Sequence, residues 1–474
     1  MRILLSTCHC LLMAVAGSAG PAAPETILTP KQISKSESPA VVLLEAVGKD
    51  QVLQASGFVV GASGLIVTNL HALDSATKVK VSLPDGRRFE EVSILAFDVE
   101  QDLAIVSVDL PSGGSGLPTA HLGETSSIGP GDAIVVISNP LGLTLTVTEG
   151  IVSAWREPQE IGAERSLEDK GPILPLPTHR LLQISAAISP GSSGGPVFNT
   201  KAEVIGIAMA GMLYGMADLN FAAPIDDVPG LLRRDSPMDL STFHERVDRA
   251  RADLARPFFE TAQLAFEQGN VKNAQRDLER ALLLFPAYEG ALLLAGRIRM
   301  DDGELDQAER LFLKAVEANE DSAEAWYRLA TLYDVMAADN GSLSMLGRAQ
   351  SAYEKCLERD GRHAGAAYGL ALLHVRRGNL ASAEELLRRA TESDSGMADA
   401  HAILGMILLE RGQLEEAETA LKQAIWENAD HALAHFGLAQ VLMAREDSYR
   451  KAAPYWKRFL ELSAGKPSLR RERE

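Results

Sequence analysis

The first half of the chain alternates short apolar runs with turns rich in glycine, asparagine and aspartate. Between residue 40 and Leu232 these runs are rich in β-branched residues and span four to seven positions, the ordinary length of a β-strand. Many short strands at regular spacing favour a barrel or a sandwich. We therefore expect an all-β domain over residues 40–232, with strands at Ala40–Ala46, Ser56–Val60, Leu65–Thr68, Lys78–Leu83, Leu103–Val108, Ala133–Ile137 and Val204–Met209.

The second half changes to Ala-, Leu- and Glu-rich sequence with the period of a helix. An alanine returns at intervals of 34, 41, 34 and 34 residues, and a glycine keeps step with it, placed to end one helix and turn into the next. Such a period is typical of stacked helix pairs. We expect a linker over 233–254 and five to six helical repeats over 255–463, marked by Ala274, Ala308, Ala349, Ala383 and Ala417.

Individual side chains support a particular kind of repeat. Trp326, Leu329, Ala330 and Tyr333 resemble the pattern of tetratricopeptide repeats. The third copy carries seven extra residues around 338–346, which we place in the turn between its helices, where an insertion costs little free energy. Cys356 stands where this repeat usually has alanine, so we expect a small buried thiol there rather than a redox site.

The N-terminus has the pattern of an export signal. Arg2 precedes an apolar run that reaches Gly17 and is followed by small residues. The run is shorter than the roughly 20 residues of a membrane span and contains polar positions, which disfavours the alternative of a membrane anchor. We expect a signal peptide over 1–23, an exported (periplasmic or secreted) protein, and no stable membrane span after its removal. Loss of Cys8 and Cys10 with the signal would leave no cysteine pair for an internal disulfide.

Charge and composition narrow the range of partners. The chain has 46 basic and 64 acidic residues, so its net charge of −18 repels phosphate backbones and disfavours nucleic-acid binding. The ten histidines are scattered, without a His-Glu-x-x-His run or a paired cysteine motif. We expect polypeptide partners, no metal site and no cofactor.

Three separate segments supply candidate chemistry. In Ser189–Val197 the glycines let the backbone present its amides and leave space around the Ser193 hydroxyl, although a Gly-Ser-rich run is often only a loop. His71 follows the second strand of a strand–turn–strand pattern and could act as a base. Asp102 stands at the entrance to an apolar strand and could orient the imidazole. Taken alone, a histidine or an aspartate in the position of His71 or Asp102 more often has a structural role.

Together these segments resemble the trypsin-like serine proteases, and most closely the HtrA (DegP-type) branch, over about residues 40–232. The resemblance implies two six-stranded β-barrels in which His71 takes the proton of Ser193 while Asp102 holds the tautomer of His71. It implies an oxyanion hole made by the amides of Gly191 and Ser193. It also implies Ala187 as the floor of the primary specificity pocket, which favours small or medium hydrophobic residues before the cut.

The chain departs from that family in several places. Ser185 stands where an acidic residue is usual, and helical repeats replace the usual PDZ module. The segment 24–39, expected as a linker, has no aromatic residue of the kind that locks HtrA trimers, which disfavours such a trimer but leaves another oligomer open. The Pro-containing stretch Arg156–Arg180 is long for a loop without its own structure. A charged tail is expected over 464–474.

Two functions remain open on these grounds. The first is a serine endopeptidase that cleaves exported or misfolded polypeptides through an acyl-enzyme, with the repeats recruiting the substrate or a protein partner. The alternative is a protease-derived scaffold whose repeats bind proteins and whose barrel is inactive.

Overall fold

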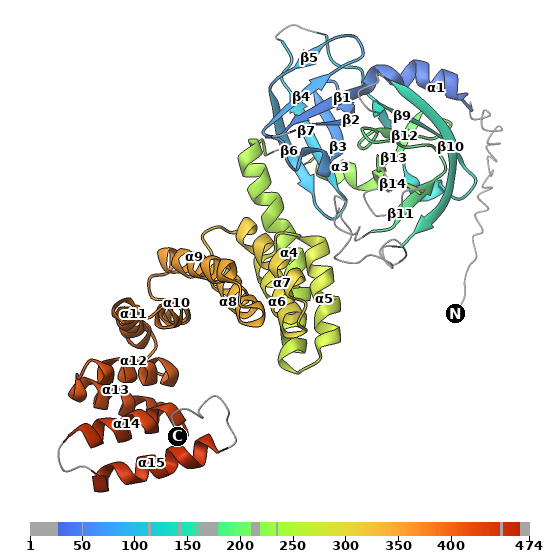
Figure 1. The fold of residues 1–474 in the computed structure, drawn as a ribbon. Helices are drawn as coiled ribbons and strands as arrows, with labels where there is room; N and C mark the ends of the chain where they lie inside the picture. The colour runs from blue at the N-terminus through green and yellow to red at the C-terminus, as the bar shows by residue number, and fades with distance from the viewer. Residues whose placement is uncertain are drawn as a thin grey trace, which may run out of the picture. The chain divides into compact units, whose positions relative to one another are not determined.

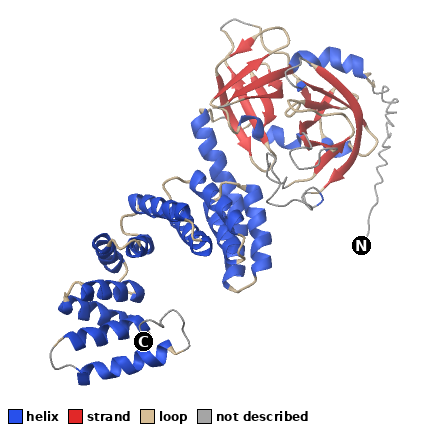
Figure 2. Ribbon diagram, in the orientation of Figure 1, coloured by secondary structure: helices blue, strands red, loops and turns tan. Residues whose placement is uncertain are grey.

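The computed structural model describes residues 27–49, 51–111, 115–140, 145–157, 160, 179–209, 219–233, 236–445 and 449–464. These residues form two compact units, Met1–Arg251 and Ala252–Glu474 (Figures 1 and 2). The first unit is built mainly of strands and the second of helices. The expected signal peptide, nearly all of the tail and most of the Arg156–Arg180 stretch lie outside the described residues.

The first sheet of the β unit contains seven strands in the order β5-β4-β1-β2-β3-β7-β6. Neighbouring strands are antiparallel throughout. The strands are β1 (Val41–Val47), β2 (Val52–Gly61), β3 (Leu65–Asn69), β4 (Lys78–Ser82), β5 (Arg88–Phe89), β6 (Val92–Asp98) and β7 (Leu103–Val108).

The second sheet has the order β12-β9-β10-β11-β14-β13-β8. An additional β12–β13 pairing closes six of its strands into a barrel, and the two-residue β8 joins β13 in parallel at the margin. The strands are β8 (His121–Leu122), β9 (Ala133–Ser138), β10 (Thr146–Arg156), β11 (Leu181–Ile184), β12 (Pro196–Phe198), β13 (Glu203–Met209) and β14 (Asn220–Pro224). This closure agrees with the six-stranded barrel that the family resemblance implies.

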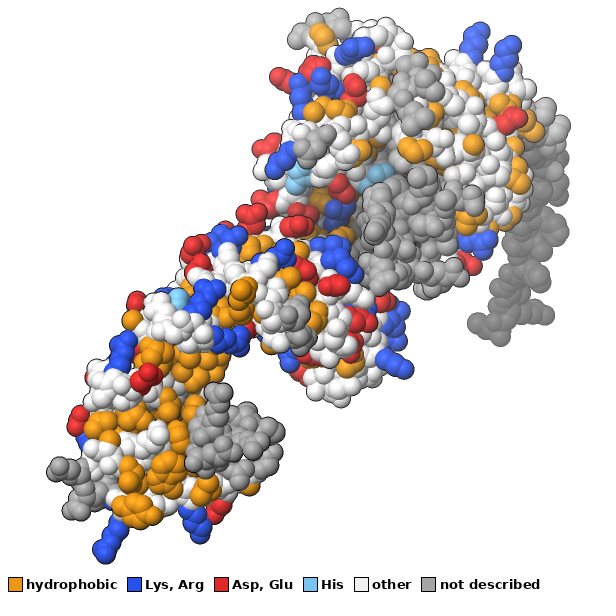
Figure 3. All heavy atoms as spheres, viewed as in Figure 1, with side chains coloured by type: hydrophobic (Ala, Val, Ile, Leu, Met, Phe, Trp, Pro, Cys, Tyr) orange, Lys and Arg blue, Asp and Glu red, His pale blue; other side chains and the backbone are white. Residues whose placement is uncertain are grey.

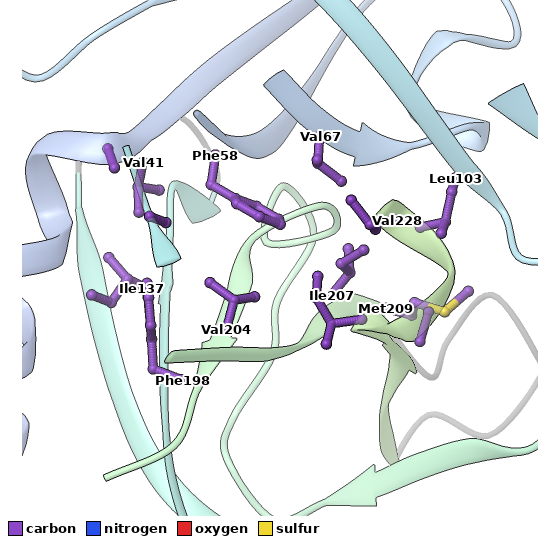
Figure 4. Packing of buried hydrophobic residues seen from close by; sticks show 14 of the residues in the cluster. Val41, Phe58, Val67, Leu103, Ile137, Phe198, Val204, Ile207, Met209 and Val228 are labelled. Atoms are coloured by element: carbon purple, nitrogen blue, oxygen red, sulfur yellow. The ribbon is translucent and has the colours of Figure 1, made fainter. Parts of the chain in front are cut away.

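Apolar side chains from both sheets meet in one core (Figure 4). Phe58 and Val67 from the first sheet face Phe198 and Ile207 from the second, and all four are fully buried. The alternation of apolar and polar residues in the strands supplies this face, since successive side chains point to opposite sides of a sheet. All seven strands expected from the sequence are present, with ends that differ by at most four residues.

Two stretches expected as linkers are structured. Residues Pro30–Glu37 form helix α1, which Thr29 and Gln32 cap reciprocally and which buries Ile33 in the core of the β unit. In the second stretch, Met238 exchanges backbone hydrogen bonds with Ile94, and a long helix, α4 (Leu240–Glu267), begins two residues later.

The first three turns of α4 belong to the β unit, which extends to Arg251. Asp239 accepts a hydrogen bond from the Thr242 amide and so caps the start of the helix. Phe243 and Val247, four residues apart on one face, are buried in the core of the first sheet. The β unit therefore extends beyond the short helix α3 (Val228–Leu231) and beyond Leu232, the last residue of the expected all-β domain.

The second unit is a series of helix pairs. Its helices are the rest of α4, α5 (Val271–Leu284), α6 (Glu289–Asp301), α7 (Leu305–Ala318), α8 (Ala323–Asn340), α9 (Leu343–Arg359), α10 (Ala364–Arg376), α11 (Leu380–Ser393), α12 (Ala398–Glu410), α13 (Leu414–Glu427), α14 (Ala432–Ala444) and α15 (Tyr449–Ser463). The most extensive contacts join α6 with α7, α8 with α9, α10 with α11, α12 with α13, and α14 with α15.

The repeat signals act as their chemistry suggests. The recurring glycines adopt positive φ angles of 73–79°, for example at Gly303 and Gly378, and each ends a helix. Gly296 lies against the ring of Phe312, where a Cβ atom would stand 2.5 Å from a ring carbon. Small residues thus let paired helices approach closely.

The insertion in the third repeat lengthens its helices instead of its turn. Helix α8 has 18 residues and α9 has 17, against 13 and 14 in the next pair, and only Gly341 and Ser342 separate them. The expectation of an enlarged turn was therefore wrong, because no glycine or proline interrupts the segment Ala323–Asn340 before Gly341. Cys356 is fully buried in α9, and burial raises the pKa of its thiol to about 12. Within the described residues, no helix has the length and apolar character needed to cross a bilayer.

Candidate active site

His71 and Asp102 form a directly hydrogen-bonded pair. The imidazole Nδ1 lies 2.6 Å from Oδ2 of Asp102, and the backbone amide of His71 donates to Oδ1 at 2.8 Å. His71 opens the short helix η2 (His71–Leu73), which is separated from β3 by Leu70 alone. Asp102 directly precedes β7, the strand paired with β3. Sequence positions 31 residues apart are therefore brought together by adjacent strands.

The backbone around Asp102 is specially arranged. Its φ angle is +54°, a left-handed conformation that aspartate adopts more readily than most residues. Its carbonyl accepts hydrogen bonds from the Leu70 amide and from the side chain of Asn69. Both of its side-chain oxygens and its carbonyl thus bind the segment 69–71, so Asp102 fixes the position of His71 as well as its ring.

The surroundings of His71 change its basicity. Burial alone lowers the pKa of the imidazole, but the charge of Asp102 and its hydrogen bond outweigh burial and raise the pKa above its ordinary value. Asp74 raises this pKa further and Arg251 lowers it. The carboxylate of Asp102 accepts a hydrogen bond from the N–H group at Nδ1, so Nε2 is the nitrogen available to accept a proton.

Ser193 lies in a tight turn between β11 and β12. Gly191 and Gly194 on either side have φ angles of +92° and +87°, so glycine is required at both positions. Backbone hydrogen bonds from Ser192 to Ser189 and from Gly195 to Ser192 hold the turn. Among the described residues, the amides of Gly191 and Ser193 donate to no other group, which leaves both as possible oxyanion donors.

A buried serine on β2 fixes this turn. The amide of Ser56 donates to the carbonyl of Ser193, and its hydroxyl donates to the carbonyl of Gly191, both at 2.8 Å. The same hydroxyl accepts from the amide of Asn139 at 2.8 Å. The carbonyl of Ser56 accepts from the hydroxyl of Thr68 at 2.7 Å. Ser56 therefore joins the turn of Ser193 to β2 and β3.

The turn of Ser193 also approaches the strand that leads to His71. A Cβ atom at Gly194 would stand 2.1 Å from the Ser56 carbonyl oxygen and 2.5 Å from the Thr68 hydroxyl oxygen, three residues before His71. Among the hydrogen bonds of the described residues, however, none joins the hydroxyl of Ser193 to the imidazole. The structure thus joins Asp102 to His71 by hydrogen bonds, and it ties the turn of Ser193 to β2 through Ser56.

The remaining candidates have simpler surroundings. Ala187 is exposed, and its carbonyl accepts a hydrogen bond from the hydroxyl of Thr148. Ser185, where the family usually has an acidic residue, accepts from the amide of Ile151 and returns a backbone bond to its carbonyl. It therefore joins β10 to β11. The role of Ala187 in specificity stays a prediction.

Sequence reasoning missed the supporting residues. Ser56 appeared only as the start of an expected strand, and Arg251 lay in a stretch taken for a linker. No motif marks either residue, because their partners lie 135 and 177 positions away along the chain.

Comparison with known proteins agrees with this architecture. Residues 55–207 match the family model of the trypsin-like peptidase domain. Residues 265–333, 344–407 and 404–467 match tetratricopeptide-repeat models.

Individual relatives match the first unit. The "Putative serine protease HhoA" of Synechocystis sp. is 40% identical over 178 residues, which cover 38% of this chain and 42% of that protein. The "Probable periplasmic serine endoprotease DegP-like" of Pseudomonas putida is 34% identical over 209 residues, 43% of this chain and 40% of that protein. A solved structure, HtrA-type protease AlgW with tripeptide, shows 30% identity and a TM-score of 0.36, covering 43% of this chain and 62% of its own.

The chain spans about two fifths of the length of these two curated relatives. The fold and the family models that match its two parts define a trypsin-like peptidase domain followed by a tetratricopeptide-repeat solenoid. Over the peptidase domain the chain is similar to serine proteases of the HtrA and DegP type. The family resemblance and the fold class expected from the sequence are confirmed.

Proposed function

We propose that this chain is a serine endopeptidase that cleaves exported or misfolded polypeptides, with His71, Asp102 and Ser193 as its catalytic residues. The observation that carries the proposal is the double hydrogen bond of Asp102 to His71, beside a turn whose Gly191 and Ser193 amides have no partner among the described residues. A hydroxyl, a base, an orienter of the base and oxyanion donors are the four parts that amide cleavage by a serine needs.

The proposed reaction has two stages, acylation of Ser193 and hydrolysis of the acyl-enzyme. The hydroxyl of Ser193 attacks the scissile carbonyl and gives its proton to Nε2 of His71, while the amides of Gly191 and Ser193 bind the oxyanion. The tetrahedral intermediate collapses, the C–N bond breaks, and His71 returns the proton to the leaving amine. A water molecule, deprotonated by the same imidazole, then hydrolyses the acyl-enzyme and restores Ser193.

In this proposal the repeats recruit the polypeptide. An open groove of about 630 Å³ lies along α11, α12 and α13, with polar side chains such as Arg388 and Gln423 around the apolar Leu404 and Leu408. Apolar side chains also gather on the face of the C-terminal repeats turned to the viewer in Figure 3. A mixed surface of this kind suits an extended segment of an unfolded chain. The name of the Pseudomonas relative favours a periplasmic site of action.

Labelling with a fluorophosphonate tests the chemistry, because the reagent needs an activated serine and no knowledge of the substrate. Adduct formation is expected on Ser193 and is lost in Ser193→Ala, with casein hydrolysis reduced roughly a millionfold. Ser192→Ala is the matched control and should retain most activity, because the hydroxyl of Ser192 already accepts a hydrogen bond from Ser138. Equal casein hydrolysis by wild type and Ser193→Ala would remove the enzyme proposal and leave the scaffold alternative.

A second variant tests recruitment. Thr419 lines the repeat groove and is exposed, so Thr419→Arg should fill part of the groove. We expect a higher KM for casein and an unchanged rate of fluorophosphonate labelling. An unchanged KM would count against this groove as the recruitment site.

A further inference from the structure

Helix α4 contributes the basic member of an ion pair next to the proposed base. The guanidinium of Arg251 donates from one nitrogen to both carboxylate oxygens of Asp74, at 3.1 and 2.8 Å. Seven residues earlier on α4, about two helical turns away, Nε2 of His244 lies 3.0 Å from the carbonyl oxygen of Leu73. Leu73 and Asp74 belong to the helix η2 that His71 opens and to its C-terminal cap.

The burial of Arg251 is hard to explain by stability alone. Its side chain is only 13% exposed, and among the described residues its Nε atom is buried without a hydrogen-bond partner. Removing a guanidinium from water and leaving one donor unpaired costs free energy that a single ion pair often fails to recover. An apolar residue beside Phe243 and Val247 would pack there without that cost. The position of this charge therefore points to a role in the site.

The charges around His71 show what that role is. Asp102 approaches from the turn before β7, Asp74 from the same short helix, and Arg251 from α4. On α4, Asp248 also interacts electrostatically with Asp74, Arg251 and His244. Asp74 and Arg251 act on the pKa of the imidazole with opposite signs, so the guanidinium opposes the second negative charge that stands beside the base.

We propose that Arg251 and Asp74 are positioning residues for the general base: their ion pair holds the helix that carries His71 and balances the charge next to its ring. This inference rests on the proposed function of His71. It makes the first three turns of α4, which follow the part of the chain that matches the peptidase family model, a working part of the peptidase unit.

The test uses the full chain and two measurements. The pH dependence of the fluorophosphonate labelling rate reports the base during reaction, and NMR titration of the His71 ring, assigned with His71→Gln, reports it without any reaction. The variants are Arg251→Gln, Asp74→Asn and the double variant. Arg249→Gln is the matched control, because it removes the same charge from an exposed position of the same helix.

The charge argument fixes the direction of each change. Arg251→Gln should move the midpoint of both profiles up by about half a pH unit, the size of effect that one charge has across several ångströms of partly solvated protein. Asp74→Asn should move it down by a similar amount, and the double variant should return close to wild type. Arg249→Gln should leave it unchanged. Raising the salt to about 1 M should shrink the shifts.

Several results would overturn the inference. Identical midpoints in wild type and both single variants would do so, as would shifts of the same sign in both. If Arg251→Gln fails to fold, Arg251→Lys keeps the charge without the planar guanidinium, and should keep the midpoint while slowing labelling. A shifted midpoint in that variant would contradict the charge balance. Absence of labelling in the wild type, with the NMR shifts as expected, would instead overturn the proposed catalysis.

Discussion

Ser56→Ala would remove the hydroxyl that joins the Ser193 turn to β2. That oxygen donates to the carbonyl of Gly191 and accepts from the amide of Asn139, in each case at 2.8 Å. The change deletes one atom and introduces no steric conflict, because alanine occupies less volume at the same fully buried position. Its effects should therefore come from the two backbone groups that lose their partner.

The size of the effect follows from how each group is buried. Asn139 is 3% exposed, so its unpaired amide costs about 1–3 kcal/mol. Gly191 is only partly buried, so water can replace its lost partner at about 1 kcal/mol. The free energy of unfolding of the β unit should thus fall by about 2–4 kcal/mol. Loss of a fixed Gly191 carbonyl should also loosen the oxyanion donors and lower kcat by about 10- to 100-fold, below the loss of a whole donor.

Calorimetry and kinetics measure the two parts separately. In a chain of two units the thermal transition of the β unit should move down while that of the repeats stays in place, by about 2–4 °C per kcal/mol for a unit of this size. Ser138→Ala is the control. It removes a buried hydroxyl whose one hydrogen bond within the described part of the chain goes to the hydroxyl of Ser192, so it unpairs no backbone group there. If Ser56→Ala behaves like Ser138→Ala in both measurements, the reasoning about the Ser193 turn is refuted.

Further predictions concern the base, the domain limit and the repeats. The wild-type rate of labelling should rise with pH through a midpoint above about 6.5, because His71 must be neutral to act and Asp102 raises the pKa of its imidazole. Asp102→Asn should lower that midpoint and reduce kcat about 10⁴-fold. Asparagine tolerates the positive φ angle at this position, so the backbone should keep its conformation. A chain ending at Leu232 loses two fully or nearly fully buried α4 side chains and should not show cooperative thermal unfolding, whereas one ending at Arg251 should. Gly296→Ala should destabilise the repeats by about 1–3 kcal/mol in urea unfolding, because its Cβ would overlap a buried phenylalanine ring. Gly347→Ala, in α9, should stabilise the repeats by about 0.5–1 kcal/mol, because its added Cβ would meet no neighbouring atom of the described residues within 4 Å. A more stable Gly296→Ala than Gly347→Ala would contradict the packing described.

The strands and repeats could be predicted because their signals are local. A strand such as Leu103–Val108 is marked by its own apolar run, and a helix end by its own glycine. The start of α4 could not be predicted in this way. Phe243 and Val247 lie in a highly charged stretch, and they belong to a core only because they pack against the first sheet. The third repeat was misjudged for a related reason: nothing in the sequence distinguishes a longer helix pair from a longer turn until Gly341 is placed.

The site divides in the same way. His71, Asp102 and Ser193 were named through a family resemblance that rests on short local runs, and the structure joins the first two by hydrogen bonds. Ser56 and Arg251 could not be named, because their importance comes from contacts with residues more than 100 positions away. Spacing along a chain carries no information about such contacts without the fold.

The buried thiol of Cys356 has a practical consequence for studying this molecule in motion. Burial raises the pKa of this thiol to about 12, so it stays protonated at neutral pH, and the residue has no exposed surface for a reagent to approach. In the part of the chain that the structure describes it is the one free cysteine. A cysteine introduced on an exposed turn could then carry a fluorophore or spin label with little competing reaction at Cys356.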